Sequence, residues 1–259
     1  MSTSPDGTSA DATVDTSTDA TITDRRSRRR TGRLAALALA GATLAGGAVA
    51  TTSVVDADGH GYQPSGPTFT YRITVENHTD AQPLSPVGTV IHDRRTDVWS
   101  RGEPASAAVA AIAEDAALPV FVDTYAQTPG VRSAFAGGGG PIGPGASASF
   151  EFEASPRDRV SLVSMLVNTN DAFTGLDSVR LGRQTQKFEV IAYDSGTEVN
   201  NENAGFIPGP VGGNAGVRDP EGNVITVHPG IVGVDGGIDP AVYDWDDPVA
   251  TITIERIRN

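Results

Sequence analysis

The sequence predicts a mainly β protein, an antiparallel sandwich with one substantial helix, and three observations support this fold class. Short apolar runs recur along the chain, and several alternate apolar with polar residues, as half-buried strands do. Turns rich in glycine and proline separate the runs, in a chain that holds 30 Gly and 17 Pro. No segment repeats at a period of roughly 20–50 residues, which argues against a solenoid or a propeller. Two packed antiparallel sheets are the expected result.

The clearest predicted strand is 68–77, because its apolar residues recur at every second position and therefore share one face. The other runs that we interpret as strands are 87–93, 148–154, 159–168, 188–194, 223–234 and 249–257. Segment 105–118 predicts the only substantial helix, because Ala108, Ile112 and Ala116 recur at helical spacing among strong helix formers. Segment 133–145 is rich in glycine and proline and is interpreted as a mobile loop.

Residues 1–50 are predicted to form a disordered start followed by an export signal. Residues 1–24 are mainly Ser, Thr, Asp and Ala, which offer little to bury. Six arginines follow between Arg25 and Arg33, and Leu34–Val55 carries no charge. Small residues at Ala48–Ala50 suit cleavage, and the modest hydrophobicity resembles a twin-arginine signal. The alternative is an uncleaved anchor, because this uncharged stretch is long enough to cross a bilayer.

Both interpretations place the folded part outside the cytoplasm. Residues 51–67 contain a cluster of turn formers and are interpreted as a linker, and 68–259 as one domain. A membrane contact is expected only through an uncleaved signal.

Composition excludes several classes of function. The chain has no cysteine, so disulfides, thiolate metal sites and a cysteine nucleophile are absent. Its net charge is -13 and Lys187 is its only lysine, which disfavours nucleic acid and anionic lipid as partners. The acidity together with the scarcity of lysine indicates a halophilic source.

The sequence contains no recognisable motif for catalysis. It lacks the nucleophile elbow, the phosphate-binding loop and the zinc-protease pattern. Of its four histidines, His92 and His228 lie at predicted strand ends and are the two candidates for chemistry. We expect no enzyme. Asn77 begins the sequence Asn-His-Thr and is a candidate glycosylation site in an exported protein.

Two acidic turns follow apolar runs and are the strongest candidate site. Asp171 follows the run that ends near residue 168, and Asp194 ends the run 188–194. If the two strands are neighbours, both carboxylates reach one cation, and Glu198 can add an oxygen or hold the loop through its backbone. Calcium takes six to eight oxygen ligands of this kind. Ordinary aspartate turns and strand caps are the alternative interpretation.

Several blocks of the sequence resemble the spondin N-terminal domain in its prokaryotic secreted form. The resemblance covers roughly residues 68–259. The blocks, in chain order, are "ENHTDAQPLSPVGTVIHD", "ASAAVAAIAEDA", "SLVSMLVNTNDAF", "AYDSGTE" and "DWDDPVATITIERI".

The resemblance implies a C2-like sandwich, an extracellular location and a bound divalent cation, generally calcium. It places Asp171 and Asp194 at the two carboxylate ligands and the backbone carbonyl of Val167 at a third. The sequence departs from the family at Ala172, which replaces a tryptophan, and at Glu198, which replaces an aspartate.

The expected function is an exported cell-surface or extracellular calcium-binding module that mediates adhesion or contacts with the envelope or matrix. A surface protein, a matrix protein or a glycan is the expected partner. One alternative is a metal-dependent hydrolase that uses Asp171, Asp194 and a nearby histidine such as His92. Another is a structural envelope protein without a specific ligand.

Overall fold

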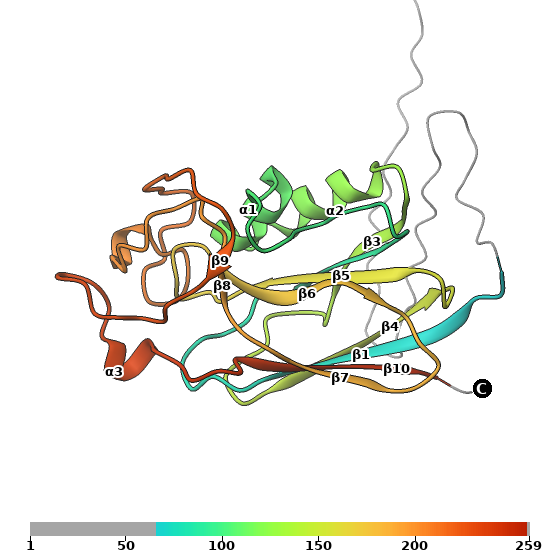
Figure 1. Cartoon of the computed structure of the whole chain (residues 1–259). Coiled ribbons are helices and arrows are strands. Elements are labelled where there is room, and N and C mark those ends of the chain that lie inside the picture. Colours follow the sequence, from blue (N-terminus) through green and yellow to red (C-terminus); the bar gives the residue numbers. More distant parts are fainter. Residues whose placement is uncertain (1–65, 258–259) are drawn as a thin grey trace, which may run out of the picture. The chain divides into compact units, whose positions relative to one another are not determined.

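The computed structural model describes residues 66–257, which form two antiparallel sheets and three helices (Figure 1). The mainly β sandwich predicted from the sequence is confirmed. The predicted export signal and nearly all of the predicted linker lie outside the described residues. Over the described range, no helix has both the length and the apolar character needed to span a bilayer.

The first sheet has four strands in the order β4-β1-β10-β7. The second has six strands in the order β3-β2-β5-β6-β8-β9, and all pairings in both sheets are antiparallel. The strands of the first sheet are β1 (Phe69–Asn77), β4 (Ser147–Ala154), β7 (Gln186–Val190) and β10 (Ala250–Arg256). Those of the second are β2 (Val87–His92), β3 (Val131–Gly137), β5 (Arg159–Met165), β6 (Ala172–Arg180), β8 (Tyr193–Asp194) and β9 (Thr226–Val227).

The main core lies between the two sheets. Tyr71, Ile73 and Val75 are buried on one face of β1, while the residues between them are less buried, as the alternation predicts. The six-stranded sheet is covered on its other face by helices, so that β2 and β5 are buried on both sides (Figure 1). This double burial explains why apolar residues occupy adjacent positions in both strands, Val90 and Ile91 in β2 and Leu162 and Val163 in β5.

Two consecutive helices form that cover, α1 (Ala107–Asp115) and α2 (Leu118–Ala126). The expectation of a single substantial helix is wrong, since α2 is as long as α1. Ala116 takes the left-handed conformation (φ 53°) and ends α1. A short third helix, α3 (Pro240–Tyr243), precedes β10. Pro119 in the first turn of α2, with Phe121 and Tyr125 one turn apart, is the signal that predicts this helix.

Four sequence assignments differ from the structure. Segment 133–145 is not simply a mobile loop, because it contains most of β3 and because Ile142 exchanges backbone hydrogen bonds with Leu84. Segment 223–234 forms only the two residues of β9, and the rest is irregular. The run 188–194 belongs to two strands, since β7 lies in one sheet and β8 in the other. Strand β6 was not expected at all.

Candidate functional site

The candidate site begins in the loop between β5 and β6, where the chain makes a tight buried turn. The amide of Leu166 donates to the carbonyl of Ala172 (2.9 Å), and the Thr169 hydroxyl bonds across the loop to both residues. Asn168, Thr169, Asn170 and Asp171 are all at most 4 % exposed. This asparagine-rich turn is therefore part of the interior.

The two asparagines of the turn hold neighbouring segments in place. Asn168 donates to the carbonyl of Ala81 (2.9 Å) and accepts from the amide of Val211 (3.2 Å). Asn170 accepts from the amide of Glu202 (3.2 Å). Because these partners are far apart in sequence, the turn is a junction of several loops at one edge of the six-stranded sheet.

Pairing of β6 with β8 brings the two acidic turns together. Asp194 lies directly opposite Ala172, the residue that follows Asp171. The amide of Ser195 also donates to the backbone carbonyl of Asp171 (3.3 Å). The neighbouring strands on which the shared-site hypothesis depends are therefore present.

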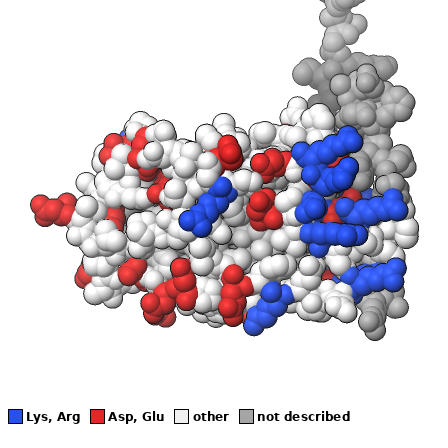
Figure 2. Space-filling view, in the orientation of Figure 1, with Lys and Arg blue, Asp and Glu red and all other residues white. Residues whose placement is uncertain are grey.

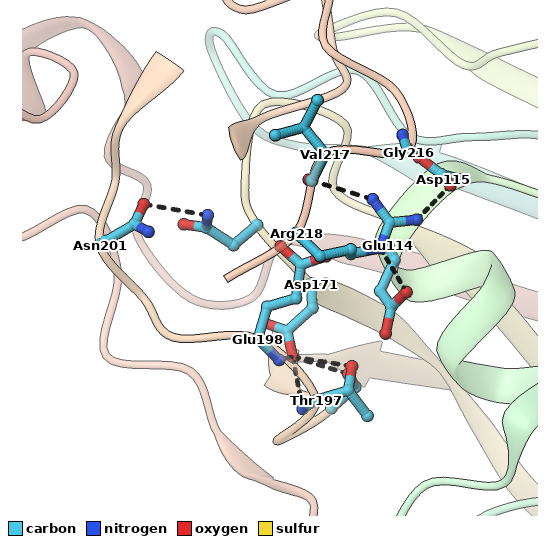
Figure 3. Close-up of polar contacts among 11 residues, drawn as sticks. Glu114, Asp115, Asp171, Thr197, Glu198, Asn201, Gly216, Val217 and Arg218 are labelled. Carbon is cyan, nitrogen blue, oxygen red and sulfur yellow. Dashed lines mark hydrogen bonds and ion pairs between the residues drawn. The ribbon is translucent and has the colours of Figure 1, made fainter. Parts of the chain in front are cut away.

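Only one oxygen of the Asp171 carboxylate accepts hydrogen bonds. Oδ2 accepts from the amides of Thr197 (2.9 Å) and Glu198 (3.0 Å) and from the hydroxyls of Ser195 (2.7 Å) and Thr197 (3.3 Å) (Figure 3). Oδ1 is buried without a hydrogen-bond partner, and the residue as a whole has 0 % exposure. A buried oxygen of this kind costs free energy unless something else binds it.

The Asp194 carboxylate closes its own turn and begins a polar chain. Its Oδ1 accepts from the amide of Gly196 (2.6 Å), and its Oδ2 accepts from the side-chain amide of Asn200 (2.6 Å). The Asn200 Oδ1 lies 3.0 Å from His228 Nε2, and His228 Nδ1 accepts from the amide of Gly230 (3.1 Å). That last bond makes Nδ1 the unprotonated nitrogen, so that Nε2 donates to Asn200.

Burial makes these acidic groups hard to ionise. It raises the pKa of Asp171, and the nearby charge of Asp194 raises this pKa further. The hydrogen bonds that the carboxylate accepts from the 195–198 turn act in the opposite direction. Burial also raises the pKa of Asp194, against its bonds from Gly196 and Asn200. Burial lowers the pKa of His228 to about 4, so this imidazole is neutral at pH 7.

Glu198 is paired with an arginine that the sequence did not single out. Its side chain has 0 % exposure, and Oε1 lies 2.8 Å from Nε of Arg218. The hydrogen on that nitrogen points at Oε2 of Glu114 (2.7 Å), and Arg218 also pairs with Asp115 (Figure 3). Glu198 thus lies at ion-pair distance from Arg218 but receives no directed hydrogen bond from it, which explains why its oxygens have no hydrogen-bond donor. Its amide fulfils the expected role of holding the loop, by donating to Asp171.

The structure places the remaining sequence candidates as follows. The Val167 carbonyl lies against Gly209, where an added Cβ would come within 2.0 Å of its oxygen. Asn77 is 1 % exposed and its Nδ2 donates to two backbone carbonyls, so that a glycan on this nitrogen would require the network to open.

His92 lies at the far end of the sheet from Asp171. It ends β2 and pairs with Arg159, which pairs in turn with Arg180 at the end of β6, whereas Asp171 precedes the start of that strand. His92 is 0 % exposed and contacts the Asp93 carbonyl and the Ser161 hydroxyl. The geometry therefore does not assemble the hydrolase that would use Asp171, Asp194 and His92.

The arrangement matches a cation in charge and in its unsatisfied oxygen. Within residues 66–257, no three His, Asp or Glu side chains converge as a preformed metal cluster. Two adjacent buried carboxylates, one with a bare oxygen, still form a site that a positive ion would relieve.

Comparison with known proteins identifies the family. The sequence model of the spondin N-terminal family (Spondin_N) matches residues 70–202, about half of the chain, and the chain belongs to this family. The match covers β1 to β8 and both acidic turns. This family is a non-enzymatic domain type, and membership implies an extracellular module. No curated protein sequence matches the chain.

Proposed function

We propose that the protein is an exported cell-surface or extracellular module that binds one divalent cation, calcium, and mediates adhesion or contacts within the envelope or matrix. The observation that carries the cation is the bare, buried Oδ1 of Asp171 beside the second carboxylate of Asp194. Membership of an extracellular family supports the location. Export through the twin-arginine-like signal, with cleavage near Ala50, belongs to the same proposal.

The proposed ligands are the carboxylates of Asp171 and Asp194, with the backbone carbonyl of Val167. Bound there, the ion would supply charge neutralisation to two carboxyls whose pKa burial raises. Glu198 serves through its amide, because its carboxyl already faces Arg218. Oxygen donors and the absence of thiols suit calcium rather than a soft metal.

The role of such an ion is structural. The carboxylates of Asp171 and Asp194 organise the 195–200 turn through hydrogen bonds from its amides and side chains. A cation that neutralises both would hold the ends of β6 and β8 together, and with them the loops that meet at this edge.

Isothermal titration calorimetry of chelator-treated protein with CaCl2 tests this proposal. We expect one site in the parent, and at least about tenfold weaker binding in Asp171→Asn and in Asp194→Asn. The matched control is Asp177→Asn, which changes an exposed carboxyl elsewhere on β6. Equal affinity in the parent and both site variants would overturn the assignment. Absence of calcium binding in the parent would overturn the cation itself.

A further inference from the structure

One end of the sandwich gathers arginines on a chain whose net charge is -13 (Figure 2). Strand pairing produces part of this cluster. Arg159, the first residue of β5, pairs with Arg180, the last residue of β6, and with His92 on its other side. His92 pairs in turn with Val131, the residue before Arg132. Three guanidinium groups therefore follow one end of the six-stranded sheet.

The loops and the other sheet add further arginines at the same end. Arg94 and Arg95 follow β2, Arg157 lies in the turn from β4 to β5, and Arg183 lies in the connection from β6 to β7. Arg256 ends β10, and its guanidinium stacks 3.2 Å above the ring of Phe69. We name this surface the arginine end. Its members are Arg94, Arg95, Arg132, Arg157, Arg159, Arg180, Arg183 and Arg256.

The arginine end contains two hollows that share one side chain. A hollow of about 500 Å³ is lined by Arg157, Arg180 and Arg183, among others. A second hollow of about 640 Å³ is lined by Arg183 and Arg256, with Glu153 as its one acidic residue. Thr70 donates a hydrogen bond to that carboxylate. Because Arg183 borders both hollows, an extended ligand can occupy the two together.

Much of the positive charge is not balanced locally. Arg94, Arg95, Arg180 and Arg183 are exposed and form no ion pair with any carboxylate of the described range. Two arginines elsewhere in the described range are compensated: Arg72 by Glu151 and Glu255, and Arg218 by carboxylates that include Glu114. The arginine end is therefore a locally positive surface on an acidic protein.

The exposed apolar residues lie elsewhere. None of the large exposed hydrophobic side chains of the described range lines either hollow. A protein partner is anchored as a rule by buried apolar and aromatic groups, and a membrane surface by inserted ones. Guanidinium groups bind carboxylate and sulfate with paired hydrogen bonds, which suits a polar, repeatedly charged ligand.

We propose that the arginine end binds an acidic polysaccharide whose carboxylate or sulfate groups bridge the two hollows. This inference rests on the proposed extracellular function and names the class of partner for it. It uses none of the residues of the proposed cation site, so each can fail without the other.

The experiment measures binding of the full chain to immobilised polygalacturonate at low salt. All proteins carry glutamine in place of the six arginines between Arg25 and Arg33, so that this segment contributes no charge. We expect Arg180→Gln and Arg183→Gln each to lower the affinity about tenfold. Arg101→Gln is the matched control. It removes the same charge from an exposed loop that bonds to Ile225 and lines neither hollow.

Binding of the parent that weakens with added salt, falls in both hollow variants and persists in the control supports the proposal. Equal binding by all variants, or equal binding to neutral dextran, overturns it. Two other results would overturn it in favour of a different partner. Preference for phosphatidylglycerol vesicles over polygalacturonate would assign the surface to a membrane. Self-association that the two variants abolish in sedimentation would assign it to a second copy. Calcium titration of the same variants reports on the cation site and on folding.

Discussion

Substituting Glu198 by glutamine should remove a large part of the pH dependence of stability. Burial raises the pKa of this carboxyl from an ordinary value of 4.5 to about 8, against the opposing charge of Arg218, and Glu114 raises it further. Since the folded-state pKa is the higher one, the stabilisation is complete below pH 4.5 and is lost as the pH rises through 8. The parent should therefore be more stable at pH 6.5 than at pH 8.

The magnitude follows from linkage. A carboxyl that is ionised in the unfolded chain and protonated in the folded one changes stability by about 1.4 kcal/mol per pH unit. Between pH 6.5 and 8, where the folded group becomes half ionised, the loss amounts to roughly 1.5 kcal/mol. This window also avoids His228, whose effect has the opposite sign and falls below pH 6.5.

The assay is urea denaturation of the full chain with chelator, at half-unit steps from pH 6.5 to 8. We expect the free energy of unfolding of the parent to fall with pH more steeply than that of Glu198→Gln, by the amount given above. Glu76→Gln, at an exposed position on β1, should retain the parent slope. Equal slopes for the parent and Glu198→Gln would refute the assignment of the raised pKa to this residue.

Three further predictions concern the end of a helix, a loop and a histidine. Ala116→Gly should raise the free energy of unfolding by about 1 kcal/mol, because glycine adopts the left-handed conformation at less cost, and an unchanged urea midpoint would contradict this. Glu202→Gln should speed amide hydrogen exchange at 232–234 about tenfold, since the carboxylate accepts from these three amides at 2.6–2.9 Å. Unchanged protection there would show that the loop is held by other contacts. The parent should lose up to about 3 kcal/mol of stability as the pH falls from 6.5 to 4, because the folded state disfavours the charged imidazole of His228. His228→Gln should not show this loss. An equal loss in parent and variant would place that titration elsewhere.

The strands that were predicted from the sequence are those whose buried faces produce a simple pattern of apolar residues along the chain. Strand β1 alternates because one face meets the core, and β5 has apolar residues at the adjacent positions Leu162 and Val163 because sheet and helices cover both of its faces. Strand β6 escaped detection because its buried part contains Thr174 and Gly175 and its exposed part is polar. An added Cβ at Gly175 would lie 1.9 Å from the Leu162 carbonyl oxygen, so close strand approach sets this residue, and no local pattern shows that.

The candidate site was predictable in its carboxylates but not in its surroundings. Asp171 and Asp194 follow apolar runs, and this placement led to the expectation that they meet. Arg218 could not be found in this way, because its partners Glu114 and Glu198 come from a helix and a distant loop. Such a contact depends on the path of the irregular segments, whose sequences show no periodic pattern from which a contact can be predicted.

A thermal melt of the full chain, first with chelator and then with added calcium, tests the central claim most directly. The shared-cation account predicts that calcium raises the melting temperature of the parent. At a free calcium concentration a hundredfold above the dissociation constant, the free energy of unfolding should rise by about 2.7 kcal/mol. Asp171→Asn and Asp194→Asn should each lose that response, and Asp177→Asn should keep it. A parent that responds to neither chelator nor calcium would contradict the account and leave the two aspartates as caps of their turns.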